Sequence, residues 1–225
     1  MVAPKGHCET SAKWLRAVLG GHVVVDTRQA ILFWERPPYP QYWVPAGHVQ
    51  LDRLARAAVQ RSDRPELDGH VHVMWDTVDH WFEEDEEVFT HPRDPYSRVD
   101  ILPSSRQVDV HLGGEKVASS SRPRVLFETG LPPRYYLPLT DLRLELLVSS
   151  DRVTQCPYKG QATYWSVQAP DRLHVDIAWT YRTPLPESRM IAGCAAFFNE
   201  RVDLVVDGEL QVRPARGSPE HVLPS

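Results

Sequence analysis

Hydrophobic and polar positions alternate over short stretches of this chain, a pattern typical of strands that bury one face. Residues 107–112 and 115–118 alternate in this way on either side of Gly113-Gly114, which predicts two strands joined by a tight turn. An equivalent hairpin is expected around Gly20-Gly21, within residues 14–26.

The same pattern predicts strands through most of the chain. Besides the pair at 107–118, they are expected at 14–19, 22–26, 31–35, 41–44, 124–128, 134–137, 142–148, 162–168, 173–180 and 202–206. Ser11 before the first of these also fits the start of a capped helix, but the similarity to the later hairpin favours a strand. The best helical pattern covers 51–60, and a short helix is expected at 187–192. The predicted fold class is therefore mostly β, with one or two short helices.

An internal repeat relates the two halves of the chain. At an offset of 93 residues, Leu19-Gly20-Gly21 aligns with Leu112-Gly113-Gly114. The same offset aligns Val24 with Val117, Glu35 with Glu128, Pro40 with Pro133, Tyr42 with Tyr135 and Pro45 with Pro138. A weaker match, of Val78-Asp79 with Val202-Asp203, requires an offset of 124. The difference between the two offsets predicts that the first copy lacks a block of 31 residues, which includes Cys156-Pro-Tyr-Lys-Gly160 in the second.

The repeat predicts two related small β-rich domains in tandem. Residues 1–95 are expected to form a truncated, degenerate first copy, and residues 96–225 a complete second copy. The proline-rich stretch His91-Pro-Arg-Asp-Pro95 falls where the boundary is expected.

Composition excludes several classes of protein. The formal net charge of −5 over 225 residues argues against nucleic-acid binding by counterion release. No apolar run approaches the ~18 residues of a membrane-spanning helix. Three scattered cysteines, Cys8, Cys156 and Cys194, exclude a disulfide scaffold, and no Cys-x-x-Cys pair is present for structural zinc. The 20 prolines favour short strands joined by turns. We therefore expect a reduced, cytoplasmic protein.

A series of short motifs runs through the second copy: His91-Pro-Arg-Asp-Pro, Arg124-Val-Leu-Phe-Glu-Thr-Gly, Pro133-Arg-Tyr-Tyr-Leu-Pro, Cys156-Pro-Tyr-Lys-Gly, Tyr164-Trp-Ser-Val, Ala178-Trp-Thr-Tyr, Pro184-Leu-Pro-Glu and Ile191-Ala-Gly. This series resembles the domain-of-unknown-function family 427 (DUF427), closely over 91–210 and in degenerate form over 14–90. The resemblance implies a β-tent-like fold, in which two antiparallel sheets enclose a cleft. Many β-tent proteins carry zinc, but the cysteine pairs are missing here, so we expect no metal and no other cofactor.

The family also carries a nucleotidyltransferase-like label. Phosphoryl transfer needs carboxylates that hold a metal and a loop that cradles phosphate. The sequence has no Gly-Ser followed by Asp-x-Asp and no G-x-x-x-x-G-K-[ST] motif. We therefore do not expect this activity.

The segment Cys156-Pro-Tyr158-Lys159-Gly carries the most suggestive chemistry. An ammonium near a thiol favours the nucleophilic thiolate, and a phenol can donate to a developing oxyanion. The alternative is a buried structural thiol in a turn shaped by the proline and the glycine, and the sequence offers no adjacent histidine base. Glu128 lies within a predicted strand, where an inward carboxylate would need a partner such as Lys159. Its recurrence as Glu35 in the first copy favours a structural role.

Aromatic side chains on separate strands are expected to line an apolar slot with polar tips. Alternation places Tyr164 and Trp165 on opposite faces of one strand, and Trp179 and Tyr181 on one shared face. The candidate pocket combines the possible catalytic residues Cys156, Lys159 and Glu128 with the ligand-binding candidates Tyr135, Tyr158, Trp165, Trp179 and Tyr181. Most of these aromatic residues also suit the core of a small domain.

Three further motifs have simple interpretations. His70-x-His72 on a strand would present two imidazoles to a metal, with Asp76, Asp79 or His80 as further ligands, but a satisfied or solvated pair is favoured. The acidic run at 83–87 is typical of a solvated face. Residues 132–138 fit a polyproline-type ligand, but their place between strands favours an ordered loop.

Two functional hypotheses follow. The first is a small-molecule pocket in the second copy, which in its stronger form is an enzyme on a small carbonyl or carboxylate metabolite, with Cys156 or Lys159 as the reactive group. The alternative is a non-enzymatic binding or assembly module, in which the first copy lost its pocket and became a packing partner. Neither nucleic acid nor a membrane is an expected partner, and the sequence leaves the ligand and the oligomeric state open.

Overall fold

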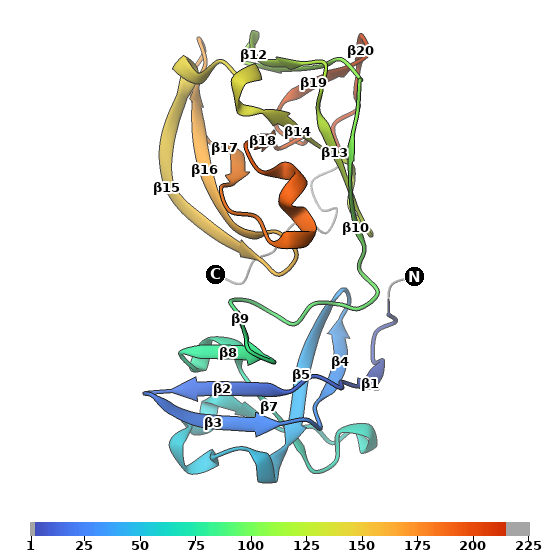
Figure 1. Cartoon of the computed structure of the whole chain (residues 1–225), viewed down its shortest axis with the longest axis vertical. Coiled ribbons are helices and arrows are strands. Elements are labelled where there is room, and N and C mark those ends of the chain that lie inside the picture. The colour runs from blue at the N-terminus through green and yellow to red at the C-terminus, as the bar shows by residue number, and fades with distance from the viewer. Residues whose placement is uncertain (1–2, 215–225) are drawn as a thin grey trace. The chain divides into compact units, whose positions relative to one another are not determined.

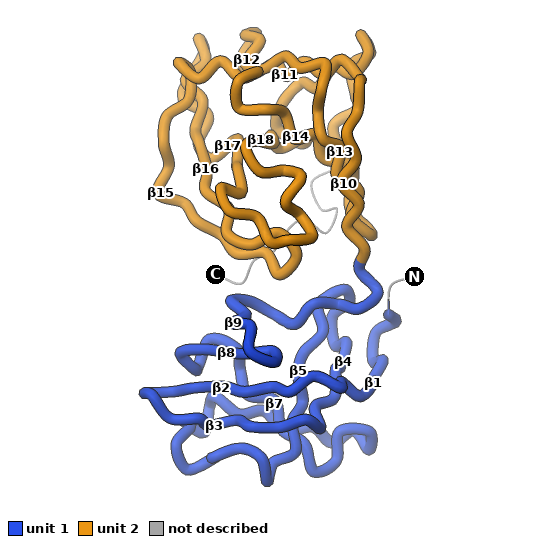
Figure 2. The backbone as a smooth tube through the Cα atoms, viewed as in Figure 1, with its two compact units in different colours: residues 1–97 blue, residues 98–225 orange. Residues whose placement is uncertain are grey.

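The computed structural model describes residues 3–214 (Figure 1), and the chain divides into two compact units, Met1–Ser97 and Arg98–Ser225 (Figure 2). Each unit is built from antiparallel strands in two sheets, with a hydrophobic core that draws residues from both. The prediction of a mostly β chain is confirmed.

The first unit holds a five-stranded and a four-stranded sheet. The five-stranded sheet has the order β1 (Cys8–Thr10), β4 (Ile31–Arg36), β5 (Tyr39–Pro45), β7 (His70–Val73) and β6 (Val59–Gln60). The four-stranded sheet has the order β3 (His22–Thr27), β2 (Leu15–Leu19), β8 (His80–Glu83) and β9 (Glu86–Val88).

The second unit holds a seven-stranded and a four-stranded sheet. The larger sheet has the order β10 (Val99–Pro103), β13 (Arg124–Glu128), β14 (Arg134–Pro138), β18 (Cys194–Phe197), β17 (Leu173–Tyr181), β16 (Gly160–Gln168) and β15 (Leu147–Cys156). The smaller sheet has the order β12 (Glu115–Ser120), β11 (Val108–Leu112), β19 (Asp203–Val206) and β20 (Glu209–Leu210). In Figure 1, β15 and β16 curve together along one side of this unit.

The two units share one framework, and the internal repeat describes it. The isolated bridge between Val25 and Val49 has its counterpart 93 residues later, between Ala118 and Leu142. The short 3-10 helices η1 (Ala46–His48) and η2 (Leu51–Arg53) also recur at this offset, as η6 (Leu139–Asp141) and η7 (Leu144–Leu146). The turns Gly20-Gly21 and Gly113-Gly114 adopt nearly the same left-handed backbone, with φ of 57° and 76° in the first and 57° and 81° in the second.

The block that the first copy lacks is mainly one hairpin. Strands β1, β4, β5, β7 and β6 correspond in order to β10, β13, β14, β18 and β17, so the first five strands of the larger sheet have counterparts. Strands β15 and β16 have none. After the missing hairpin the two units are related by an offset of 124. Val44 pairs with Val71, and its equivalent Leu137 pairs with Ala195, which lies 124 residues after Val71.

The seven-stranded sheet separates two cores, because neighbouring residues of a strand point to opposite faces. Leu137 and Ala178 pack against the four-stranded sheet in the inter-sheet core. Tyr136 and Trp179, one residue away in each strand, pack in a second core on the other face. We call this second core the inner cluster; its buried members are Ile101, Leu126, Tyr136, Cys156, Ala162, Tyr164, Trp179, Tyr181, Ile191, Cys194 and Ala196.

Two predicted elements differ in the structure. Residues 51–60 form η2, then η3 (Arg56–Ala58) and β6, instead of one helix. The apolar spacing that predicted a helix also suits successive 3-10 turns that bury Leu54 and Ala58, and the pairing of Val59 with Val73 then draws the chain into the sheet. The strand predicted at 142–148 begins only at Leu147, because η7 precedes it.

The weaker match, which aligned Val78-Asp79 with Val202-Asp203 at an offset of 124, is wrong by one residue. Leu15 of β2 pairs with Glu83, whereas its equivalent Val108 pairs with Val206, so β8 and β19 are related by an offset of 123 and not 124. The loop between β18 and β19 is one residue shorter than the loop between β7 and β8. Asp79 therefore corresponds to Val202.

Helices are short in both units. The helix expected at 187–192 is the 3-10 helix η8 (Pro186–Ile191). Among residues 3–214, no helix has the length and apolar character needed to cross a bilayer.

Candidate functional site

The segment 156–160 forms the turn of the β15–β16 hairpin. Cys156 pairs with Gly160 at the end of the ladder, and Gly160 has a φ of 90°, a left-handed conformation that favours glycine. This turn carries Lys159 into the protein, where it is only 2% exposed. A lysine at this depth is uncommon unless it is paired.

Glu128 is the partner of Lys159. The ammonium donates to Oε2 of Glu128 at 2.6 Å, which joins the turn to the last residue of β13. Both side chains are largely shielded from solvent, at 3% and 11% exposed. Removing both charges from water is costly, so this pair is held only because each charge compensates the other.

The charges around Lys159 determine its protonation state. Burial by itself would lower the pKa of the ammonium, but Cys156, Glu128 and Tyr136 lie close enough to outweigh burial and raise it above the usual range. These neighbours therefore favour the charged form of Lys159, which can attract or polarise an anionic or carbonyl oxygen.

Aromatic residues surround this pair on the inner face of the sheet. The indole N–H of Trp179 donates to the Tyr136 hydroxyl at 3.1 Å, and the two rings meet edge to face. Burial raises the pKa of Tyr136 and of Tyr181 well above the usual value, so both remain phenols. Tyr164 exchanges a hydrogen bond with Thr154 at 2.9 Å.

The segment around η8 covers the turn. The backbone N–H of Leu185 donates to the Lys159 carbonyl at 3.2 Å, and the Ser188 hydroxyl donates to the Tyr158 carbonyl at 2.8 Å. Ile191, at the end of η8, is fully buried in the inner cluster. This cover was missed by the sequence analysis; the run Pro184-Leu-Pro-Glu was noted there only as a family motif.

The structure brings together only part of the predicted pocket. Glu128, Lys159, Cys156, Trp179 and Tyr181 belong to one face of the sheet, and Tyr158 packs partly buried at its edge. Tyr135 and Trp165 pack instead against the inter-sheet core, on the opposite face. Each lies one residue from a member of the inner cluster, so strand alternation separates them from it.

The inner-cluster residues Tyr136 and Tyr164 belong with the candidate site, although the predicted pocket left them out. The signal was in the sequence, since each precedes or follows a selected aromatic residue by one position. To choose Tyr136 over Tyr135, and Tyr164 over Trp165, one must know which face of the sheet the turn with Lys159 packs against. The order of the strands in the sheet determines that face, and the sequence of one strand does not.

The equivalent place in the first unit is an open cavity of about 490 Å³. Phe33, Glu35 and Trp43, which line it, are the counterparts of Leu126, Glu128 and Tyr136 at the offset of 93. The first unit therefore has a cavity at the position where the second unit holds the Lys159–Glu128 pair. Because the first unit lacks the β15–β16 hairpin, none of its described residues is the equivalent of Lys159. Gln60 of the two-residue strand β6 lies at the rim instead.

A smaller cavity of about 280 Å³ lies in the second unit, away from the turn at 156–160. Its lining includes Arg201 and Arg213, which are already engaged. Arg201 donates to the Val175 carbonyl at 2.9 Å, and Arg213 donates to Asp203 at 2.6 Å. The lining shares no residue with the predicted pocket.

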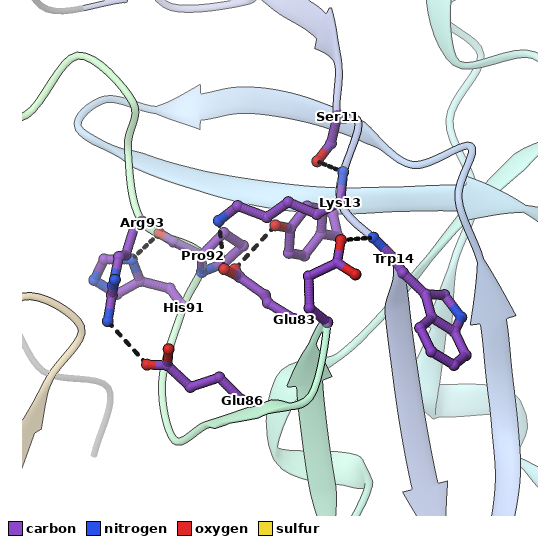
Figure 3. A network of polar contacts seen from close by, with 10 residues as sticks. Ser11, Lys13, Trp14, Glu83, Glu86, His91, Pro92 and Arg93 are labelled. Atoms are coloured by element: carbon purple, nitrogen blue, oxygen red, sulfur yellow. Dashed lines mark hydrogen bonds and ion pairs between the residues drawn. The ribbon is translucent and has the colours of Figure 1, made fainter.

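The acidic run at 83–87 takes part in a polar network of the first unit (Figure 3). Tyr42 donates to Glu83 at 2.9 Å and Lys13 donates to the same carboxylate. Burial and the negative charge of Glu83 raise the pKa of the Tyr42 phenol. Arg93, from the segment after β9, binds Glu86 at 3.2 Å. These carboxylates therefore link Tyr42 of the five-stranded sheet, Lys13 before β2 and Arg93 after β9 to the four-stranded sheet.

The histidines considered as metal ligands are engaged separately. The Nδ1 atom of His70 lies 2.8 Å from the Asp68 carbonyl, and that of the buried His72 lies 2.9 Å from the Tyr42 carbonyl. His80 contacts Glu87, and Asp79 accepts from the backbone N–H of Gly20. Burial lowers the pKa of His72. Within residues 3–214, no three His, Cys, Asp or Glu side chains are grouped to hold a metal.

Comparison with known proteins gives one result. A family model described as a domain of unknown function (DUF427) matches residues 7–65 and 100–208, one segment in each unit and together more than half of the chain. No curated protein matches the sequence.

Proposed function

We propose, for a chain that belongs to the DUF427 family, that the second unit binds a small carbonyl or carboxylate compound at the Lys159–Glu128–Cys156 cluster. The observation that supports the proposal is the burial of Lys159. A lysine that is 2% exposed, with one carboxylate partner and a thiol nearby, costs stability that an apolar residue would not cost. Such groups concentrate at functional sites.

Each residue has a distinct role in this proposal. The Lys159 ammonium attracts the ligand's oxygen and stabilises negative charge that develops on it. Glu128 holds the ammonium in place. Cys156 is the candidate nucleophile, because its thiol lies close to the paired ammonium of Lys159. The phenols of Tyr136 and Tyr181 add hydrogen-bond donors beside an apolar wall.

The segment at η8 would have to move for a ligand to enter. It is held to the turn by two hydrogen bonds, from Leu185 and Ser188, and by the buried side chain of Ile191. Short cover segments of this kind exclude water once a ligand is bound. The three cysteines are free, which suits a reducing compartment such as the cytoplasm.

A screen of small aldehydes, ketones and carboxylates by thermal shift tests the proposal. We expect at least one compound to stabilise the wild-type protein and to lose its effect in Cys156→Ala or Lys159→Met. Cys194→Ala is the matched control, because Cys194 is equally buried in the inner cluster but lies outside the turn.

The outcomes separate the two hypotheses. A compound that loses its effect in Cys156→Ala but not in Cys194→Ala supports chemistry at the turn. Equal stabilisation of wild type and Cys156→Ala supports binding without a reactive thiol. If no compound stabilises the wild type, the cluster is structural, and the non-enzymatic assembly module is the better description.

A further inference from the structure

The cavity of the first unit combines a basic rim with an aromatic wall. Lys5, Arg61 and Arg64 form the basic rim, and Phe33, Trp43 and Glu35 line the wall. Its volume of about 490 Å³ falls within the range of sites for small organic ligands. It arises because β6 is short and the hairpin that fills this place in the second unit is absent.

The rim carries an excess of positive charge. Lys5, Arg61 and Arg64 face one carboxylate, Glu35, in a chain whose formal net charge is −5. Within residues 3–214, neither Lys5 nor Arg61 forms a hydrogen bond or ion pair with another side chain. Two cations at the edge of a concave surface, without carboxylate partners, attract an anion.

Arg64 is held in position before any ligand arrives. Its guanidinium lies 5.1 Å from the centre of the Phe33 ring and donates to the Gly6 carbonyl at 3.2 Å. It also lies 3.6 Å from the Glu66 carboxylate. A guanidinium fixed in this way loses little entropy when it binds a planar anion.

The wall of the cavity is apolar and rigid. Phe33 and Trp43 are almost completely buried and meet edge to face, with ring centres 6.2 Å apart. The buried indole N–H of Trp43 has no hydrogen-bond partner among the described residues. The equivalent hydroxyl in the second unit, that of Tyr136, is satisfied by Trp179.

We propose that the first unit binds a flat organic anion in this cavity, an aromatic compound with one carboxylate. The ring of the ligand contacts the exposed edges of Phe33 and Trp43, and its carboxylate lies between Arg61 and Arg64 near Lys5. Glu35 remains as an acceptor for a donor group on the ligand and disfavours a second negative charge. This site is separate from the cluster at Lys159 and does not depend on it.

Isothermal titration of the full chain with 2-naphthoate tests the proposal. Its neutral amide, 2-naphthamide, removes the charge, and inorganic phosphate removes the ring. We expect 2-naphthoate to bind with one-to-one stoichiometry and at least about tenfold more tightly than either. Removal of both guanidiniums, in Arg61→Ala/Arg64→Ala, should weaken binding by about tenfold or more, and Glu35→Gln should strengthen it by a few-fold.

Arg56→Ala is the matched control, because Arg56 is exposed in the same unit and does not line the cavity. It should bind like the wild type. Circular dichroism of each variant verifies folding. The proposal is overturned if 2-naphthoate does not bind at millimolar concentration, if the amide or phosphate binds equally well, or if Arg61→Ala/Arg64→Ala leaves the affinity unchanged.

Discussion

Glu35 and Glu128 occupy the same position in the two units but stand in opposite surroundings. Glu128 is buried against the ammonium of Lys159, whereas Glu35 is exposed at the edge of a cavity. The difference is made by a single hairpin, β15–β16, whose turn supplies the lysine. The burial and the ion pairing of Glu128 are therefore determined by the β15–β16 hairpin. This hairpin does not pair with β13, the strand of Glu128, and is not next to it in the sequence.

The comparison also separates the strands that both units share from the hairpin that only the second unit has. Five strands of the larger sheet, the paired glycine turns and the isolated bridges are common to both units, so they do not require the hairpin. The hairpin adds two strands at one edge and fills the concavity that the shared strands create. Substitutions in the two units test this comparison, and they differ in the size of the expected loss of stability.

Lys159→Met should produce the largest difference between the units. It leaves Glu128 buried without a partner and should destabilise the second unit by about 3–5 kcal/mol, whereas Glu35→Gln should have little effect on the first. Amide hydrogen exchange in increasing urea, followed by mass spectrometry, assigns the loss to each unit. The double variant Lys159→Met/Glu128→Leu should recover most of the loss. A full-sized loss in that double variant would contradict the explanation by an uncompensated charge.

Ile191→Ala and Leu67→Ala test whether η8 controls access to Cys156. Both side chains are fully buried at equivalent positions, 124 residues apart, and each truncation should cost about 2–5 kcal/mol in its own unit. Only Ile191→Ala should also increase the rate at which Cys156 reacts with an alkylating reagent, measured by mass spectrometry of the labelled peptide. Equal labelling of Cys156 in both variants would show that η8 does not control access.

Gly113→Ala and Gly20→Ala separate backbone strain from crowding. Both glycines have a φ of 57°, where a side chain costs about 1–2 kcal/mol. A Cβ atom at Gly113 would also lie 2.0 Å from Asp171, which must move away from His174, whereas a Cβ atom at Gly20 meets open space. We expect the larger loss in Gly113→Ala, read from the urea midpoint of each unit. Similar losses would show that backbone conformation alone sets the cost.

Acid should reveal the smallest difference. Arg122 binds Asp141 and, with Ser120 and Thr140, holds the pKa of that carboxyl at about 2, below its usual value. Because the folded pKa is depressed, this stabilisation is present above about pH 4 and is lost as the pH falls toward 2. The equivalent position in the first unit is His48, which contacts Thr27. Asp141→Asn should flatten the pH dependence of the second unit's urea midpoint between pH 4 and 2, and an unchanged slope would contradict this account.

The sequence predicts the shared framework better than the contents of the site. The glycine turns and the 93-residue offset are local identities, and both recur in the backbone. The second match rested on the dipeptide Val78-Asp79 and two apolar positions after it. A loop that is one residue shorter in the second unit shifts the true register of β8 against β19, and so short a match does not detect the shift. The helix predicted at 51–60 failed because 3-10 turns bury residues at the same spacing.

Within the site, alternation separated Tyr164 from Trp165 but did not indicate which of them lies with Lys159. That choice depends on which face of the sheet receives the turn at 156–160. The cover at η8 was not predicted as part of the site, because its contacts to the turn involve backbone carbonyls of Tyr158 and Lys159. Such contacts leave no signature in the side chains.

The hairpin that fills the inner cluster also leaves the second unit with a long edge strand. β15 is an edge strand ten residues long, whose outward backbone groups are available for pairing with another chain, and Val148 and Val153 are exposed along it. Its register shifts between Ser149 and Val153, where residues 150–152, which include Asp151 and Arg152, stand opposite the single residue Tyr164 of β16. A kinked, charged interruption of this kind prevents a straight ladder from extending across the edge. It therefore protects the unit against the aggregation to which the added hairpin would expose it.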